Sequence, residues 1–193
     1  MSLESVLLFA QKTISDRVKA GDAVVDATVG LGSDTLFLAR VTGTDGIVFG
    51  FDIQPEALAI AQSKMKDRLS TADSASIHWI LRSHEFMLAE IPSKYQGKIR
   101  AVMFNLGYLP HSDHLIKTQP QTTVKGLDAA VQLLQIGGVV TIIVYTGHEG
   151  AQEEADAVLL WASLLAQKQF NVISYRFLNQ VNDPPFLIIV EKK

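Results

Sequence analysis

The stretch AVVDATVGLGSDT, residues 23–35, decides the fold of this chain. It opens with a short apolar run that ends at Asp26, and Gly30 and Gly32 follow within a few residues. Glycine allows the backbone to turn tightly and to approach a ligand closely. The small and polar residues that begin at Ser33 are typical of a helix start. We therefore predict a strand, a glycine turn and a helix, in that order.

Strand-like apolar runs and helix-like segments alternate through the rest of the sequence. The predicted strands are residues 23–26, 47–52, 76–81, 100–105, 139–145, 171–177 and 186–191. The predicted helices are residues 33–41, 55–68, 121–135 and 151–167, with an amphipathic helix over residues 1–20. This alternation predicts one doubly wound, Rossmann-like α/β domain with helices on both faces of a mostly parallel sheet.

The end of the predicted sheet departs from the parallel pattern. Residues 178–185 alone separate the last two of the seven predicted strands, and a parallel crossover needs about a dozen residues or more. The last strand is therefore expected to run antiparallel to its neighbour. Five parallel strands with helices, followed by such a hairpin, resemble the class I methyltransferase fold. Ligands in sheets of this kind bind beyond the carboxyl ends of the strands.

The composition is that of a globular protein without a compartment address. We expect residues 1–193 to form a single domain, with no run of about 18 apolar residues that would span a membrane. The N-terminus does not read as a signal peptide, so we expect a cytoplasmic protein. The absence of cysteine excludes disulfides and thiolate chemistry. A formal net charge of -3 argues against a large nucleic-acid footprint but leaves room for a small basic patch.

The first two strand ends favour S-adenosylmethionine (SAM) over a dinucleotide. Asp26 places a carboxylate before the glycines, and Thr35 stands where a dinucleotide site has its third glycine. A carboxylate suits SAM, which carries an ammonium and a sulfonium and no phosphate. Asp52 could accept both ribose hydroxyls, Ile53 could pack on adenine, and His84 follows the third strand near the adenine edge. The predicted cofactor-binding residues are Asp26, Ala27, Thr28, Gly30, Gly32, Asp34, Thr35, Asp52, Ile53, Gln54, Ser83, His84 and Asn105.

Three of these assignments have structural alternatives. Asp26 could be a helix cap beside ordinary turn glycines. Asp52 could cap the helix that Pro55 begins. His84 could be a polar loop residue at a helix start. The joint occurrence of the ligand groups at successive strand ends favours the cofactor interpretation.

The fourth strand ends in a loop that suits an amine acceptor. Methyltransferases acting on exocyclic amines carry Asp/Asn-Pro-Pro-Tyr/Phe here, and Asn105 and Tyr108 have the same spacing around Leu106-Gly107. The asparagine oxygen would direct the nitrogen lone pair at the methyl group, and the aromatic ring would stack on the substrate. The predicted catalytic residues are Asn105, Tyr108 and His148, and the predicted substrate-binding residues are Leu106, Gly107, Tyr108, Pro110, Tyr145 and His148. A capping asparagine, a packing aromatic ring and a loop histidine are the structural explanations that compete with these roles.

No metal site is predicted. His111 and His114 flank Asp113, but no partner ligands stand elsewhere at a recognisable spacing. Residues 182–185, NDPP, lie in the final hairpin loop, where they either rim the pocket or form a plain turn.

Several motifs together resemble one family. They are VVDATVGLGSDT, FDIQ, RSHE, FNLGYLP, VYTGHEG with the acidic Glu153-Glu154 that follows, and NDPPF, and they run from residue 24 to residue 186. They resemble the family described as putative rRNA methylases, which is similar to the bacterial tRNA 5-aminomethyl-2-thiouridine methyltransferases. Ser33 stands where many relatives are expected to have Asn.

The resemblance implies methyl transfer to the aminomethyl nitrogen of the wobble uridine, with the tRNA anticodon region as partner. Candidate phosphate contacts are Lys94, Lys98, Lys117 and Lys125. Methylation of rRNA, of a small molecule or of a protein amine would keep the same cofactor site and change the acceptor. A nicotinamide-dependent oxidoreductase and a non-catalytic binding module are two further functions that this fold could support. A homodimer is the commonest soluble assembly, and nothing in the sequence tests it.

Overall fold

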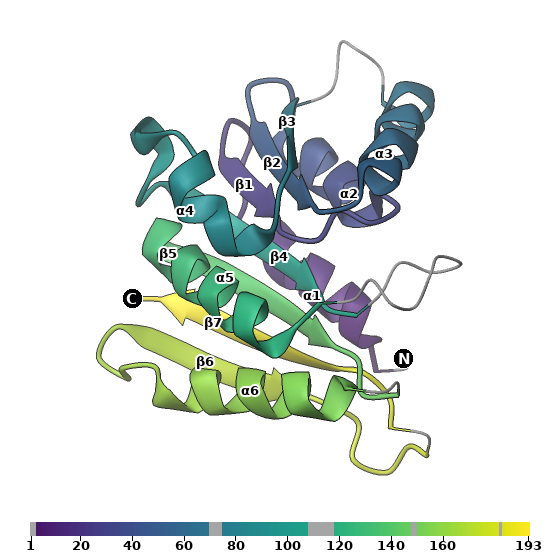
Figure 1. Cartoon of the computed structure of the whole chain (residues 1–193). Coiled ribbons are helices and arrows are strands. Elements are labelled where there is room, and N and C mark those ends of the chain that lie inside the picture. The colour runs from purple at the N-terminus through teal and green to yellow at the C-terminus, as the bar shows by residue number, and fades with distance from the viewer. Residues whose placement is uncertain (1–2, 70–74, 108–117, 148–149, 182) are drawn as a thin grey trace.

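The computed structural model describes residues 3–69, 75–107, 118–147, 150–181 and 183–193. In these residues a seven-stranded sheet has the order β3-β2-β1-β4-β5-β7-β6 (Figure 1). Strand β7 pairs antiparallel with both β5 and β6, and the other neighbours are parallel, as predicted. The strands are β1 (Ala23–Asp26), β2 (Ile47–Asp52), β3 (Ser76–Leu81), β4 (Ile99–Asn105), β5 (Leu134–Val144), β6 (Phe170–Tyr175) and β7 (Phe186–Lys192).

Helices cover both faces of the sheet because the buried strands are apolar on both sides. Strand β1 shows this, since Val24 packs with Ile14 and Leu38 on one face while Val25 packs in the core cluster of the other face. The helices are α1 (Val6–Ser15), α2 (Ser33–Thr42), α3 (Pro55–Arg68), α4 (Met87–Glu90), α5 (Pro120–Leu133) and α6 (Ala151–Leu164), with 3-10 turns η1 (His84–Phe86) and η2 (Ser93–Tyr95). None of the helices in the described ranges is long and apolar enough to cross a membrane.

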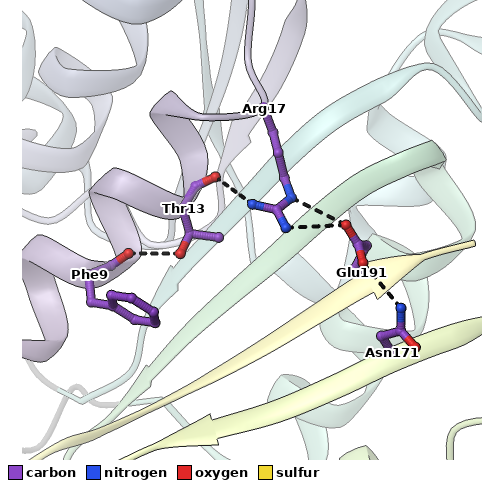
Figure 2. A network of polar contacts seen from close by, with 5 residues as sticks. All are labelled: Phe9, Thr13, Arg17, Asn171 and Glu191. Atoms are coloured by element: carbon purple, nitrogen blue, oxygen red, sulfur yellow. Dashed lines mark hydrogen bonds and ion pairs between the residues drawn. The ribbon is translucent and has the colours of Figure 1, made fainter.

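Helix α1 packs against strands β5 and β7 of the sheet. Arg17 follows α1 and donates from Nε and Nη2 to Oε1 of Glu191 on β7, at 3.4 and 3.2 Å (Figure 2). The Arg17 Nη1 group donates to the carbonyl of Thr13, and Asn171 on β6 donates to Glu191 Oε2 (Figure 2). Partly exposed ion pairs contribute little energy individually. The network therefore serves mainly to orient α1. The buried apolar face of this helix supplies most of the stabilisation.

The boundary between α5 and β5 is the main correction to the predicted fold. The helix predicted over residues 121–135 ends at Leu133, and β5 begins at Leu134 rather than at 139. Between these positions the register with β4 shifts, in a bulge. A Cβ on Gly138 would lie 3.0 Å from the Ile99 carbonyl oxygen, so a side chain there would crowd β4. The pair Gly137–Gly138, which by sequence suits the end of that helix, therefore lies within β5, and Gly138 lets two strands approach closely.

Other boundaries also differ from the prediction. The N-terminal helix occupies Val6–Ser15 rather than 1–20, and α6 ends at Leu164 rather than at 167. Strand β6 begins one residue early and ends at Tyr175. The short helices between β3 and β4 were not predicted. Strand order reverses between β1 and β4, so the switch point lies where their carboxyl ends meet, the usual ligand position in such folds.

Candidate active site

Asp26 organises the glycine loop from beneath. Its side chain is 1% exposed, and it accepts hydrogen bonds from Thr28 N at 3.1 Å and Thr35 Oγ1 at 2.5 Å. Burial, followed by the nearby Asp34 charge, raises the pKa of Asp26 to about 7, against the opposing effect of the two hydrogen bonds. Gly32 occupies the N-cap of α2 without a side-chain cap, so the alternative of Asp26 as helix cap is wrong.

Asp52 holds the other side of the same loop. Its Oδ2 atom accepts from Gly30 N at 2.8 Å, and its Oδ1 atom accepts from Gln54 N at 2.9 Å. Gln54, not Asp52, is the N-cap of α3, which removes the capping alternative. Each carboxylate oxygen has lone pairs left for the two ribose hydroxyls. Ile53 beside it is 54% exposed, so its side chain is available to an aromatic ring.

The glycines have conformational and packing reasons to be glycine. Gly30 and Gly32 have φ of 50° and 73°, in the left-handed region that side chains disfavour. A Cβ on Gly32 would lie 2.7 Å from Ala61 Cβ, so α3 could not keep its place. Lys64 on α3 also reaches the loop and donates to the Leu31 carbonyl at 3.1 Å. The loop is thus held in one shape from both sides.

Asn105 brings the fourth strand end to this loop. Its backbone N donates to Thr28 Oγ1 at 2.8 Å. Its side chain hydrogen-bonds with the carboxyl of Asp34 and with Tyr145, and in each case the bond lowers the partner's pKa. Gln11 on α1 also hydrogen-bonds to Asp34. Side chains from α1, α2 and the ends of β4 and β5 therefore converge beside the glycine loop.

Asp34 is the electrostatic centre of this cluster. The residue is 6% exposed, and its Oδ1 atom is buried without a hydrogen-bond partner among the described residues. Burial raises the pKa of Asp34, although the bonds from Gln11 and Asn105 and the Lys64 charge lower it. Partial burial and the Asp34 charge likewise raise the pKa of Tyr145. A buried carboxyl oxygen without a donor is an incomplete site, and a bound ammonium would complete it.

His84 is a buried packing residue. Its ring is edge-on to Phe104, with centroids 5.4 Å apart, and a Cβ on Gly126 of α5 would lie 2.5 Å from its Cδ2 atom. Burial lowers the pKa of His84 to about 4, so the ring is neutral at pH 7. Ser83 caps η1 by accepting from Glu85 N at 3.4 Å. The adenine contact assigned to Ser83 and His84 stays a prediction.

Several predicted residues lie outside the described ranges, so their assigned roles stay predictions. They are Tyr108, Pro110, His111, Asp113, His114, Lys117, His148 and Asn182. Within the described ranges, no group of three or more His, Asp or Glu side chains could hold a metal. The hairpin loop is joined to the end of β5, because Thr146 Oγ1 donates to the Asp183 carbonyl at 2.8 Å.

The candidate phosphate-binding lysines are not gathered at the site. Lys94 and Lys98 precede β4, so they lie at the amino end of that strand, the edge opposite the glycine loop. Lys94 stacks over the Tyr95 ring at 4.8 Å, and Lys125 pairs with Glu85 at 3.1 Å. Of the described candidates, Lys125 on α5 is the one that faces an element next to the predicted cofactor residues.

Comparison with known proteins decides the family. The sequence model of the family described as "Putative rRNA methylase" matches residues 48–191. This chain belongs to that family. A putative rRNA-methylase from Clostridium thermocellum is 41% identical with a TM-score of 0.93, and each chain is covered in full.

Two further relatives bear on the cofactor and the acceptor. A putative methyltransferase from Streptococcus mutans, solved in complex with SAH, is 32% identical over 100% of both chains, with a TM-score of 0.87. The chloroplastic tRNA (mnm(5)s(2)U34)-methyltransferase of Arabidopsis thaliana is 30% identical over 181 residues, 91% of this chain. The chain spans 65% of the length of that plant protein. The fold and the family together make this domain a SAM-dependent methyltransferase domain of the RNA-methylase type.

Proposed function

We propose that this protein methylates the 5-aminomethyl nitrogen of the wobble uridine in tRNA, with SAM as the methyl donor. The observation that carries the proposal is the position of Asn105, whose side chain lies with Asp34 and Tyr145 beside the glycine loop. An amide oxygen here can accept a hydrogen bond from an amine and direct its lone pair. The plant relative, named for the same reaction, supports this acceptor.

The chemistry asks for alignment more than for acid or base. The neutral amine nitrogen attacks the methyl carbon, the carbon–sulfur bond breaks, and its electron pair stays on sulfur. The products are the methylated amine, S-adenosylhomocysteine and one proton. Because sulfonium is already a good leaving group, most of the rate comes from holding nitrogen, methyl carbon and sulfur in line. Asn105 would position the amine nitrogen, and the glycine loop held by Asp26 and Asp52 would position the sulfur of SAM.

Nucleoside analysis tests the acceptor. tRNA from cells with and without the gene is digested and its nucleosides are measured by mass spectrometry. The proposal predicts loss of the methylated 5-aminomethyluridine and accumulation of its unmethylated precursor. Unchanged tRNA nucleosides with a missing rRNA methyl group would overturn the acceptor while leaving the cofactor intact.

Ribosomal RNA is the second candidate acceptor. A stretch of 73 residues is 36% identical to the ribosomal RNA small subunit methyltransferase H of Acidobacterium capsulatum, although that match covers 38% of this chain. The net charge of -3 offers little general attraction for a large RNA surface. We favour a small exposed target such as an anticodon base, which is read by stacking and edge contacts.

The proposed setting is the cytoplasm, with the protein acting on free tRNA. The proposed assembly is a homodimer, which light scattering of the purified protein tests directly. A mass equal to one chain at micromolar concentration would refute the dimer without affecting the reaction.

The pKa of Asp26 leads to a pH prediction for cofactor binding. Because its pKa in the empty site is about 7, this carboxyl is largely protonated at pH 5.5, and a cationic ligand favours the charged form. SAM affinity should therefore rise about tenfold from pH 5.5 to 7 and then level off, with proton release on binding. Calorimetry in two buffers of different ionisation enthalpy measures both effects. Asp26→Asn should flatten this rise, and an unchanged slope in that variant would contradict the assignment.

The same carboxyl group should make the unliganded protein less stable as pH rises, whereas the affinity for SAM increases. The folded-state pKa of Asp26 lies above its ordinary value of 3.8. Its contribution to the free energy of unfolding is therefore fully present below pH 3.8 and is lost as pH rises through about 7. The melting temperature of the unliganded wild type should therefore fall between pH 5 and pH 8 by more than the melting temperature of Asp26→Asn does.

Asp34 is predicted to bind the ammonium of the SAM amino-acid group. Asp34→Asn removes the charge and keeps the shape, so affinity for S-adenosylhomocysteine should fall about tenfold or more. 5′-Methylthioadenosine lacks the ammonium, and its affinity should stay within about twofold. Calorimetry with both ligands measures the difference. Equal losses for the two ligands would show a structural role, and no loss for either would refute ammonium binding.

A further inference from the structure

Glu154 is a buried carboxylate that the proposed reaction does not use. It lies in the first turn of α6 and is 3% exposed. Its Oε2 atom accepts from Thr118 Oγ1 and its Oε1 atom accepts from Thr123 Oγ1, both at 2.6 Å. Two short bonds to a charged acceptor offset the cost of burying this group. The two hydroxyl partners of Glu154 lie in different parts of the structure, and their positions indicate what the carboxylate does.

Thr118 connects Glu154 to the chain just after Asn105. The Thr118 Oγ1 atom accepts from Gly107 N at 2.9 Å, and Thr118 N donates to the Gly107 carbonyl at 2.9 Å. Gly107 has a φ of 139° and stands two residues beyond the end of β4. Thr123, in contrast, lies within α5 and makes a bond between two helices. One carboxylate oxygen therefore serves the acceptor side, and the other serves helix packing.

The charge of Glu154 decides which way the Thr118 hydroxyl points. A hydroxyl has one proton to donate. That proton can go to Glu154 at 2.6 Å or to the Gly107 carbonyl at 3.5 Å, and the shorter, charge-assisted bond wins. With its proton so directed, the oxygen presents lone pairs to Gly107 N. Without the carboxylate, the hydroxyl is free to rotate and the bond to Gly107 N loses its fixed acceptor.

We infer that Glu154 is a positioning residue for the acceptor amine, acting through Thr118 on Gly107 and hence on Asn105. The inference rests on the proposed function for its catalytic consequence. Leu106 N also donates to the Ile143 carbonyl at 2.9 Å, which continues the line of β4 and leaves Gly107 as the point that Thr118 holds. An acceptor group displaced by about 1 Å can cost about 100-fold in rate, so a bond at this point is placed to matter.

Amide exchange tests the physical link without any substrate. By NMR of the labelled protein with S-adenosylhomocysteine, the Gly107 amide should exchange at least about tenfold faster in Thr118→Val and Glu154→Met than in the wild type. Thr123→Val is the matched control, because it removes the other bond to Glu154 and leaves Gly107 alone. Unchanged Gly107 exchange in Glu154→Met, which has no acceptor oxygen, would overturn the inference whatever the acceptor is.

Steady-state kinetics tests the catalytic consequence. Thr118→Val should lower kcat with tRNA about tenfold to 100-fold, with SAM affinity within about twofold of the wild type. Thr118→Ser should restore most of the rate, because it restores the hydroxyl, and Thr123→Val should lose melting temperature but keep kcat within about threefold. Equal kcat losses in Thr118→Val and Thr123→Val would refute a positioning role. A wild type that methylates no tRNA refutes the proposed function instead, and the exchange result still decides the link to Gly107.

Discussion

Asn105→Ala is expected to lower the rate of methyl transfer about 100-fold while SAM affinity stays within about threefold of the wild type. The side chain removed is the one that lies with Asp34 and Tyr145 at the end of β4. The Asn105 backbone bond to Thr28 remains, so the glycine loop keeps its shape. The loss should appear in the rate constant of methyl transfer, measured in single-turnover reactions at saturating SAM.

The matched control is Asn171→Ala. Asn171 is an exposed asparagine on β6, at the edge of the sheet far from β1 and β4, and it bonds to Glu191. This variant should turn over at the wild-type rate. Normal turnover by Asn105→Ala would refute the amine-directing mechanism, and a parallel loss of SAM affinity would leave Asn105 only its predicted cofactor-binding role.

Asp52→Ala is expected to weaken SAM binding at least about 100-fold. Two hydrogen bonds from ribose hydroxyls to a carboxylate are lost together, each worth about 1.5–3 kcal/mol. The hydrogen bonds that Asp52 accepts from Gly30 N and Gln54 N are lost as well. Calorimetry with S-adenosylhomocysteine measures the affinity, and a thermal melt separates lost binding from lost folding.

Two comparisons make the Asp52 result specific. Asp52→Asn keeps one acceptor oxygen and should lose less affinity than the alanine variant. Asp22→Ala removes a carboxylate that pairs with Arg100 at 3.4 Å at the amino end of β1, away from the carboxyl ends of the strands, and should leave affinity unchanged. An Asp52→Ala protein that folds and binds S-adenosylhomocysteine normally would contradict the ribose assignment. Binding of NAD by the wild type would favour a nicotinamide-dependent oxidoreductase instead.

Local patterns predicted the parts of the fold that depend on neighbours in the sequence. The strand, glycine turn and helix of residues 23–35 and the terminal hairpin follow from strand composition and connection length. The Gly137–Gly138 pair shows the limit, because a glycine pair after a helical pattern is typical of a helix end. At Gly138 the reason is the approach of the backbone carbonyls of Ile99 and Arg100 on another strand. A contact so distant in the sequence leaves no local trace.

The same limit explains the site residues that the motifs missed. Gln11 stands in an amphipathic helix with no motif, and it reaches Asp34 because α1 is docked along β5 and β7. Glu154 follows one of the motifs, but its role went unassigned because its partner Thr118 lies 36 residues away in the sequence. The ring of His84 packs in the core because Gly126 on α5 leaves room for it, and no motif indicated this. In each case the direction of a side chain was decided by an element elsewhere in the chain.

Transfer of a labelled methyl group by the purified protein tests the central claim most directly. SAM with a deuterated methyl group and tRNA bearing an unmethylated 5-aminomethyluridine are incubated with the protein, and the digested nucleosides are analysed by mass spectrometry. The account predicts one deuterated methyl group on the aminomethyl nitrogen of the wobble uridine and none with Asn105→Ala on the same timescale. Label on another atom or nucleoside, or no transfer to tRNA by a wild-type protein that binds SAM, would contradict it.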